Sequence, residues 1–160
     1  LHPRVRRQRQ MCIRDSCISD AVSDCVQPYE VLAQTREKNL TSDIEENLSY
    51  IGDERSIRQM VGILMDNAIK YSSENGNITL KFKKNGKKIL LEVYNDAENL
   101  PTGKLDVLFE RFYRLDSSRN SATGGSGIGL SVAKAIVQAH KGKITAENKN
   151  GKGLKITVIL

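Results

Sequence analysis

Two pairs of segments with alternating hydrophobicity constrain the fold of this chain most strongly. Residues 78–82 and 89–93 alternate apolar and polar side chains on either side of Asn85-Gly86. An Asn-Gly pair between two such segments is typical of a two-residue β-hairpin. Residues 143–148 and 154–159 repeat the pattern around a second Asn-Gly pair. Because side chains alternate between the two faces of a strand, this pattern predicts an antiparallel sheet with an apolar face that another layer must cover.

Helical periodicity in three segments supplies that layer. Apolar side chains recur at helical spacing in residues 17–38, where Pro28 is expected to interrupt or bend the helix, in 54–72 and in 128–140. A short strand is predicted over 40–46. Together these segments predict an α+β fold, a two-layer sandwich in which helices cover one face of a mixed, mostly antiparallel sheet.

The composition is that of one globular domain, and it argues against several functional classes. The chain has 160 residues, 39% of them hydrophobic, and no apolar run reaches the roughly 18 residues that a membrane-spanning helix needs. Its three cysteines have no accompanying histidine cluster, which disfavours a zinc site and indicates reduced thiols. The net charge is +6, but the arginines of residues 1–16, less Asp15, account for four of these charges. The +2 that remains on residues 17–160 argues against a nucleic-acid groove.

Residues 1–16 lack apolar periodicity and are excluded from the predicted fold. The string over residues 6–16 resembles the translation of a transposon-end adapter used to prepare sequencing libraries. Our hypothesis is that residues 1–16 are an assembly artefact and disordered, and that one domain occupies residues 17–160. A natural codon context without an adapter match in the underlying nucleotide read would contradict this hypothesis.

A glycine-rich stretch opens directly into the last predicted helix. Gly124-Gly125-Ser126-Gly127-Ile128-Gly129-Leu130 precedes the apolar positions of that helix. Such a loop presents unpaired backbone N–H groups and the positive end of a helix dipole, which together favour an anion such as a phosphate group. The alternative is a loop that only connects two elements, because a lone glycine pattern is weak evidence.

Polar side chains interrupt the apolar face of the helix predicted over 54–72. Asn67 lies on that face, and Lys70 and Tyr71 follow it at i+3 and i+4. An amide oxygen is a ligand for hard cations such as Mg²⁺, and a lysine and an aromatic ring would suit a phosphate and a base. Asp66 could orient water or polarise a nucleophile. Equally, Asn67 could bond a neighbouring backbone group, Lys70 could be solvated, and Asp66 could be a surface acid.

Two further polar residues have both a functional and a structural interpretation, and a third has a structural one. Asn95 follows the end of a predicted strand, where its amide could bond an amino-purine edge or form a turn. Arg114 precedes the polar segment 115–126 and could neutralise a transferring phosphate or lie on the surface. His140 ends the glycine-led helix, where a histidine complements the helix dipole. The sequence offers no convincing nucleophilic histidine, zinc motif or Walker-type loop.

Taken in order along the chain, these stretches resemble the catalytic ATP-binding domain of sensor histidine kinases. That domain belongs to a superfamily with gyrase, heat-shock chaperones and mismatch-repair ATPases. Residues 66–72 resemble its N box, 95–101 lie where the first glycine box belongs, 108–114 resemble the F box and 124–130 resemble the second glycine box. The resemblance covers about residues 17–160. Four motifs in the right order form a specific signal, and the F box favours a kinase over the other ATPases.

The resemblance implies an ATP site that uses Mg²⁺. It assigns magnesium to Asn67 and a phosphate contact to Lys70, and it makes residues 115–126 the ATP lid. It gives Asp66 a role in the transfer to histidine. The other nucleotide contacts that it implies are those of Tyr71, Asn95, Arg114, Gly125, Gly127, Ile128, Gly129 and Leu130.

One departure from the family concerns the first glycine box, which normally holds an aspartate and two glycines. Asn95, Ala97 and Asn99 occupy those places here. Asn95 offers adenine an uncharged acceptor, and Ala97 and Asn99 adopt glycine's dihedral angles less freely, so nucleotide affinity is the property at risk. This departure favours an alternative function. The chain would then be a non-catalytic or ATP-hydrolysing member of the same superfamily that acts as a protein-interaction module.

The phosphorylated histidine of the family lies on an upstream helical hairpin, which this sequence does not supply. The resemblance therefore implies the catalytic fragment of a protein-histidine kinase in a two-component phosphorelay. Its partners would be the phosphoacceptor histidine domain of the parent kinase and a response regulator. The parent would be a homodimer anchored in the bacterial plasma membrane, with this domain in the cytoplasm. For this segment we expect contact with neither nucleic acid nor membrane.

Overall fold

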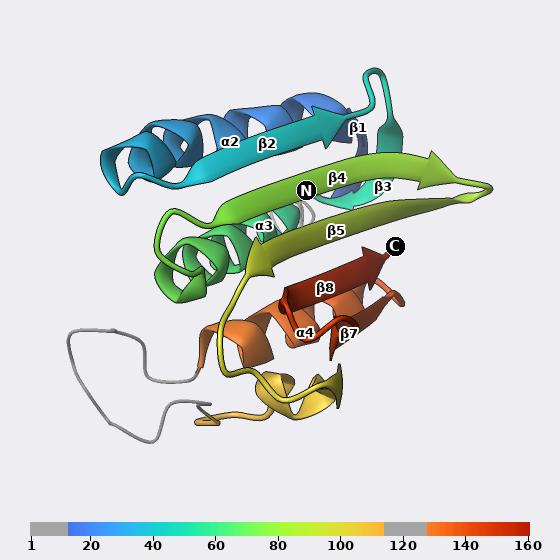
Figure 1. Cartoon of the computed structure of the whole chain (residues 1–160). Coiled ribbons are helices and arrows are strands. Elements are labelled where there is room, and N and C mark those ends of the chain that lie inside the picture. The colour runs from blue at the N-terminus through green and yellow to red at the C-terminus, as the bar shows by residue number, and fades with distance from the viewer. Residues whose placement is uncertain (1–12, 114–127) are drawn as a thin grey trace.

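A six-stranded sheet forms the centre of the computed structural model, which describes residues 13–113 and 128–160 (Figure 1). Its strands lie in the order β2 (Asn39–Ile44), β4 (Asn77–Asn85), β5 (Lys88–Asp96), β8 (Gly153–Ile159), β7 (Lys143–Asn148) and β6 (Gly103–Lys104). Only β2 and β4 pair in parallel, and the other neighbours are antiparallel. The predicted mixed, mostly antiparallel sheet is confirmed.

Both predicted hairpins are present. Strands β4 and β5 pair from Asn85 opposite Lys88, and Gly86 between them has a φ of +64°. That left-handed conformation is one that glycine adopts at little cost. Strands β7 and β8 form the second hairpin, and β8 also pairs with β5. The two hairpins therefore lie side by side in one sheet. Their alternating apolar side chains can then share one face.

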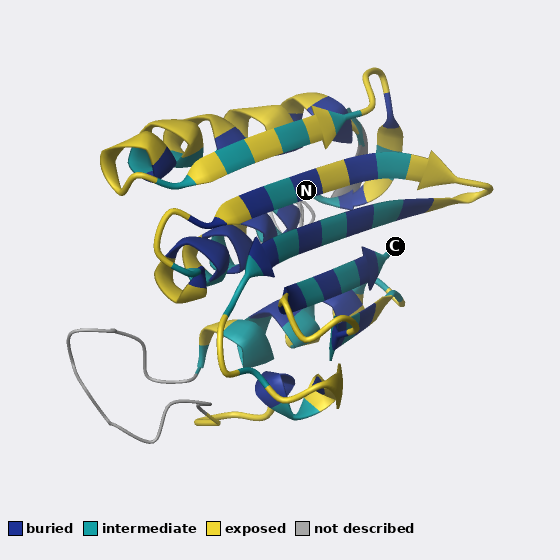
Figure 2. Ribbon diagram, viewed as in Figure 1, coloured by how far each residue is buried: buried dark blue, intermediate teal, exposed yellow. Residues whose placement is uncertain are grey.

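Within the described residues, three helices and a short 3₁₀ turn cover one face of this sheet (Figure 1). The helices are α2 (Ile18–Thr35), α3 (Glu54–Tyr71) and α4 (Gly129–Ala139), and the turn is η1 (Asp106–Phe109). Helix α2 continues through Pro28, contrary to the expected interruption. The core lies between helices and sheet, where the inward side chains of β4 and β5 alternate with less buried ones (Figure 2).

The buried face of α3 is rotated relative to the sequence-based expectation. Its buried side chains are Ile57, Met60, Val61, Leu64, Met65, Ala68 and Ile69. Asn67, which the sequence analysis placed on the apolar face, lies at the border of this buried surface, as does Ile63. Tyr71 is 39% exposed. The polar residues of the N box therefore lie where the helix surface passes from the core to solvent, which suits a ligand more than a packing role.

A two-stranded ribbon, which the sequence analysis did not predict, lies beside the main sheet. Strand β1 (Ile13–Cys17) pairs antiparallel with β3 (Ser49–Asp53). The expected disorder of residues 1–16 is therefore wrong for residues 13–16, while residues 1–12 lie outside the described part of the chain. A backbone ladder needs no apolar periodicity, which is why the pattern gave no sign of it. The hypothesis about the origin of residues 1–16 stays a hypothesis.

No helix in the described part of the chain is long and apolar enough to cross a membrane.

Candidate functional site

The C-terminal end of α3 is held by a lysine from the segment before β2. The Lys38 ammonium donates to the carbonyl oxygens of Ile69 and Ser72, at 2.9 and 2.8 Å, and to Ser72 Oγ at 2.6 Å. Ile69 lies in the last turn of α3 and Ser72 is its C-cap, so neither carbonyl has a backbone partner within the helix. Burial lowers the pKa of Lys38. The cation thus fixes the helix end on its inner side, while Lys70 and Tyr71 remain exposed on the outer side.

The end of β5 is tied to this same end of α3. The backbone N–H of Ser73 donates to the carbonyl oxygen of Asp96 at 2.9 Å. Asn95 and Asp96 are the last two residues of β5 and not residues beyond it, so their side chains point to opposite faces of the sheet. Asn95 continues the buried row of β5 and is 2% exposed, with Nδ2 donating to the Asp96 carbonyl at 3.2 Å.

Asp96 has a structural role on the opposite face. Its Oδ2 accepts the backbone N–H of Asn77 at 2.9 Å, and its Oδ1 accepts the hydroxyl of Tyr94 at 2.8 Å. The Asn77 backbone bond, the largest cause, lowers the pKa of Asp96. Of the two polar residues at this strand end, only Asn95 faces the helix layer.

The described end of the second glycine box lies against α3. Helix α4 begins at Gly129, after Ile128, whose side chain has no hydrogen-bonding group to cap the first amides. A Cβ added to Gly129 would lie 3.5 Å from Cγ2 of Ile63. Ile63 lies one turn before Asn67 on α3. The positive end of α4, with Ile128, Gly129 and Leu130, therefore begins close to Asn67. Arg114, Gly125 and Gly127 lie outside the described residues.

Asp66 has a different neighbourhood from Asn67. The hydroxyl of Tyr29 on α2 donates to the carbonyl oxygen of Gly62 at 3.1 Å. Burial, and then the Asp66 carboxylate, raise the pKa of Tyr29 to about 12. Because successive helix residues are about 100° apart around the axis, Asp66 faces α2 while Asn67 lies toward Ile63 and α4. The structure therefore brings Asn67, Lys70, Tyr71, Asn95 and the start of α4 to one end of α3, and places Asp66 beside α2.

The altered first glycine box is accommodated by the backbone. Asn99 has a φ of +58°, in the left-handed region that asparagine tolerates better than most residues. The N–H of Ala97 donates to the carbonyl oxygen of Lys152 at 2.9 Å. At these two positions the departure from glycine does not prevent an ordered loop.

Asn148 is a buried polar residue that the sequence analysis did not select. It is 0% exposed, and its Nδ2 donates to the carbonyl oxygen of Leu100 at 3.0 Å. Among the described residues its Oδ1 has no hydrogen-bond partner. The register of β7, β8 and β5 places Asn148 and Asn95 on either side of Leu154. The inward alternation of β7 carried this signal, because position 148 continues the row of Ile144 and Ala146.

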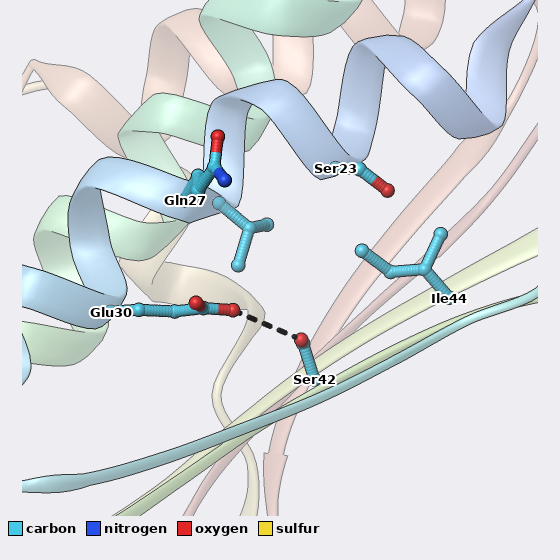
Figure 3. Close-up of a pocket in the computed structure, with 6 residues that line it drawn as sticks. Ser23, Gln27, Glu30, Ser42 and Ile44 are labelled. Atoms are coloured by element: carbon cyan, nitrogen blue, oxygen red, sulfur yellow. Dashed lines mark hydrogen bonds between the residues drawn. The ribbon is translucent and has the colours of Figure 1, made fainter.

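A surface groove elsewhere contains none of the predicted site residues. It lies between α2 and the edge strand β2, where Ser42 Oγ donates to Glu30 Oε1 at 3.5 Å (Figure 3). Its other lining residues are Ser23, Val26, Gln27 and Ile44. Within the part of the chain that the structure describes, no group of three or more His, Cys, Asp or Glu side chains could hold a metal ion.

Comparison with known proteins identifies the family of this chain. Residues 52–160 match the family model described as histidine kinase-, DNA gyrase B-, and HSP90-like ATPase. The chain is 31% identical over 145 residues to the sensor histidine kinase RppB of Synechocystis, covering 90% of this chain and 32% of that protein. It is 41% identical over 110 residues to the sensor histidine kinase WalK of Bacillus subtilis, covering 68% of this chain and 18% of that protein. The chain thus spans about a third or less of these curated relatives.

Solved structures show the same fold. The catalytic domain of the histidine kinase ThkA aligns with a TM-score of 0.76 at 20% identity, covering 92% of this chain and 94% of that one. The mycobacterial sensor histidine kinase MprB aligns with a TM-score of 0.74 at 19% identity, covering 92% and 96%. The chain therefore belongs to the histidine kinase-, DNA gyrase B- and HSP90-like ATPase family, as the catalytic ATPase domain of a sensor histidine kinase.

Proposed function

We propose that this domain binds Mg·ATP between α3, the end of β5 and the start of α4, and transfers the γ-phosphoryl group to a histidine on another domain of its parent kinase. One observation carries the proposal. Gly129 lies against Ile63, one turn from Asn67, and the Ser73–Asp96 bond brings the end of β5 to the same end of α3. Segments that are far apart in the sequence thus offer an amide oxygen, a cation and the first amides of α4 to one ligand.

The chemistry of these donors suits Mg·ATP. The Asn67 amide oxygen would hold Mg²⁺, which commonly takes few protein ligands and completes its shell with phosphates and water. Lys70 and the first N–H groups of α4, at Gly129 and Leu130, would bind phosphate oxygens. When bound, the metal would neutralise charge that develops on the transferring phosphate.

The base would lie on the β5 side of the site. Asn95 is the polar residue in a row of buried apolar side chains, where its amide oxygen would accept from the adenine amino group. Tyr71, exposed at the end of α3, would cover the nucleotide. Residues 115–126 with Arg114, Gly125 and Gly127 would close over the phosphates. These roles stay predictions, because that segment lies outside the described residues.

Phosphoryl transfer requires mainly positioning from the protein. A nitrogen of the acceptor imidazole would form the new bond to the γ-phosphorus while the bond to the bridging oxygen of ADP breaks. That imidazole would come from the phosphoacceptor domain, in the same subunit or its dimer partner, and a response regulator would receive the phosphoryl group next. We place the parent kinase in the plasma membrane with this domain in the cytoplasm.

A second candidate function is a protein-interaction module that has lost catalysis or only hydrolyses ATP. The altered first glycine box favours it, because the uncharged Asn95 is a weaker acceptor than the usual aspartate. The ordered backbone at Asn99 weakens this alternative.

Magnesium-dependent binding of a fluorescent ATP analogue tests the proposal. We expect Asn67→Ala to weaken binding by about 100-fold, since it removes the metal ligand, with little change in the free energy of unfolding. Gln59→Ala, at an exposed position of the same helix, is the matched control and should bind as the unmodified chain does. No magnesium-dependent binding by a folded unmodified chain would contradict the proposal and favour the interaction module. Turnover without a histidine acceptor would favour an ATPase.

A further inference from the structure

His140 lies at the C-terminal end of α4 and bridges two elements that are far apart in the sequence. Its Nδ1 is 2.8 Å from the carbonyl oxygen of Ile136 in its own helix. Its Nε2 accepts the backbone N–H of Asp53, at 3.1 Å and across 87 positions of sequence. A carbonyl only accepts and an N–H only donates, so these partners assign the proton to Nδ1 and make the ring neutral. The Nδ1–H bond to the Ile136 carbonyl satisfies one of the last acceptors of α4, which fits the role predicted for a histidine at this helix end, while the bond to Asp53 was not predicted.

The residues around the His140 ring are held in place by contacts of their own. Asp53 is the N-cap of α3, and its carboxylate accepts from the Arg55 N–H at 3.2 Å and from Ser56 Oγ at 2.7 Å. The rings of His140 and Tyr50 lie 6.1 Å apart between centroids. A Cβ on Gly52 would collide with the Tyr50 ring and lie 2.9 Å from Cδ2 of His140. The bare backbone at position 52 thus leaves room for the ring, and the His140 bond ends on the N-cap residue of α3.

The lengths of α3 and α4 show how the bond between His140 and Asp53 aligns the two helices. From Asp53 to Ile63 is about 15 Å along α3, and the eleven residues of α4 span about 16 Å. Helix α4 therefore runs antiparallel beside α3, with its end bonded to Asp53 through His140 and its start packed against Ile63. A shift of α4 along this direction would move Gly129 relative to Asn67.

We propose that His140 is a positioning residue, which sets the axial register of α4 against α3 and thereby places the phosphate end of the nucleotide site opposite Asn67. The inference rests on the proposed function. His140 lies at the opposite end of α4 from the ligand. It would therefore act only through the placement of α4. Loss of the acceptor at Nε2 leaves the Asp53 N–H without its partner and releases α4 to slide or tilt.

Two substitutions separate the hydrogen bond from packing. His140→Leu keeps an apolar side chain near Tyr50 and Gly52 but offers no acceptor. His140→Gln places an amide oxygen within reach of the Asp53 N–H and serves as the rescue variant. Ile89→Val, a core change near the opposite end of β5, is the control for a general loss of stability.

Nucleotide affinity and amide NMR are measured on the whole chain. We expect His140→Leu to weaken binding of a fluorescent Mg·ATP analogue by about tenfold, as loss of one partly buried hydrogen bond implies, and His140→Gln to restore most of it. Ile89→Val should leave affinity unchanged. In the free protein, His140→Leu should move the amide signal of Asp53 and weaken the nuclear Overhauser contact between Gly129 and the Ile63 methyl groups.

Two results would overturn the proposal. One is His140→Leu binding with the affinity of the unmodified chain. The other is an unchanged contact between Gly129 and Ile63 once the Asp53 hydrogen bond is lost. The second readout needs no nucleotide, so it decides the role of His140 even if the unmodified chain fails to bind ATP, which would contradict the proposed function instead.

Discussion

The N-terminal end of α3 directs its polar groups to protein partners, whereas the C-terminal end leaves several of them facing solvent. At the first end, the Asp53 carboxylate accepts from Arg55 and Ser56, and the Asp53 backbone N–H donates to His140. At the other end, Lys38 binds the last carbonyls, but Lys70 is exposed and Asn67 is half-buried. One helix is thus anchored at its start and leaves polar side chains accessible at its end, where we propose the ligand binds.

This difference shows how a marginally stable domain can keep polar groups available for a ligand. Side chains left for a ligand contribute little to folding, so the helix that carries them needs anchors elsewhere. In α3 these anchors are the Asp53 cap, the buried side chains and the Lys38 ammonium. Substitutions of anchors should therefore lower stability, and substitutions of presented groups should lower affinity.

Lys38→Met should show the largest effect on stability. The substitution leaves the carbonyls of Ile69 and Ser72 without their charged donor, and we expect a loss of about 2–3 kcal/mol in the free energy of unfolding by urea titration. Because Lys70 and Tyr71 share that last turn, affinity for the ATP analogue should also fall several-fold. Arg36→Ala, at an exposed neighbouring position, is the control. A Lys38→Met domain as stable as the unmodified chain would remove this lysine from the set of anchors.

Asp53→Ala should show a smaller effect, confined to stability. Removing the N-cap carboxylate should cost about 1 kcal/mol in the same titration. The backbone N–H that meets His140 remains, so affinity for the ATP analogue should stay within about twofold at temperatures where the protein is folded. A large loss of affinity in this variant would show that the start of α3 does more than anchor the helix.

Local patterns predicted the elements of this fold better than their placement. The hairpin of β4 and β5 follows from alternation and an Asn-Gly turn, and α3 begins at Glu54 because Asp53 caps it. The parallel pairing of β2 with β4 joins segments whose own sequences carry no sign of each other. The short strands β1, β3 and β6 are held by backbone bonds, which leave little trace in side-chain patterning.

In the candidate site, too, the sequence predicted the residue types better than their positions. The residue types of the N box and the second glycine box are enough to indicate phosphate chemistry, because amide, ammonium and bare backbone groups suit that ligand wherever they meet. The burial of Asn95, the contact between Asp66 and Tyr29 and the bridge from His140 to Asp53 depend on tertiary packing. The helix-end position of His140 followed from the sequence, but its bond to the Asp53 N–H joins segments whose own sequences carry no sign of each other.

We propose that one end of α3, with the end of β5 and the start of α4, holds the nucleotide and its metal. Paramagnetic broadening of amide NMR signals by an ATP analogue loaded with Mn²⁺ in place of Mg²⁺ tests it most directly. We predict strong broadening at Asn67 and Gly129 and a sharp signal at Asp53, which lies about 21 Å away along the helix. Broadening at Asp53 equal to that at Asn67, or none at Asn67 and Gly129 with the ligand bound, would contradict the account.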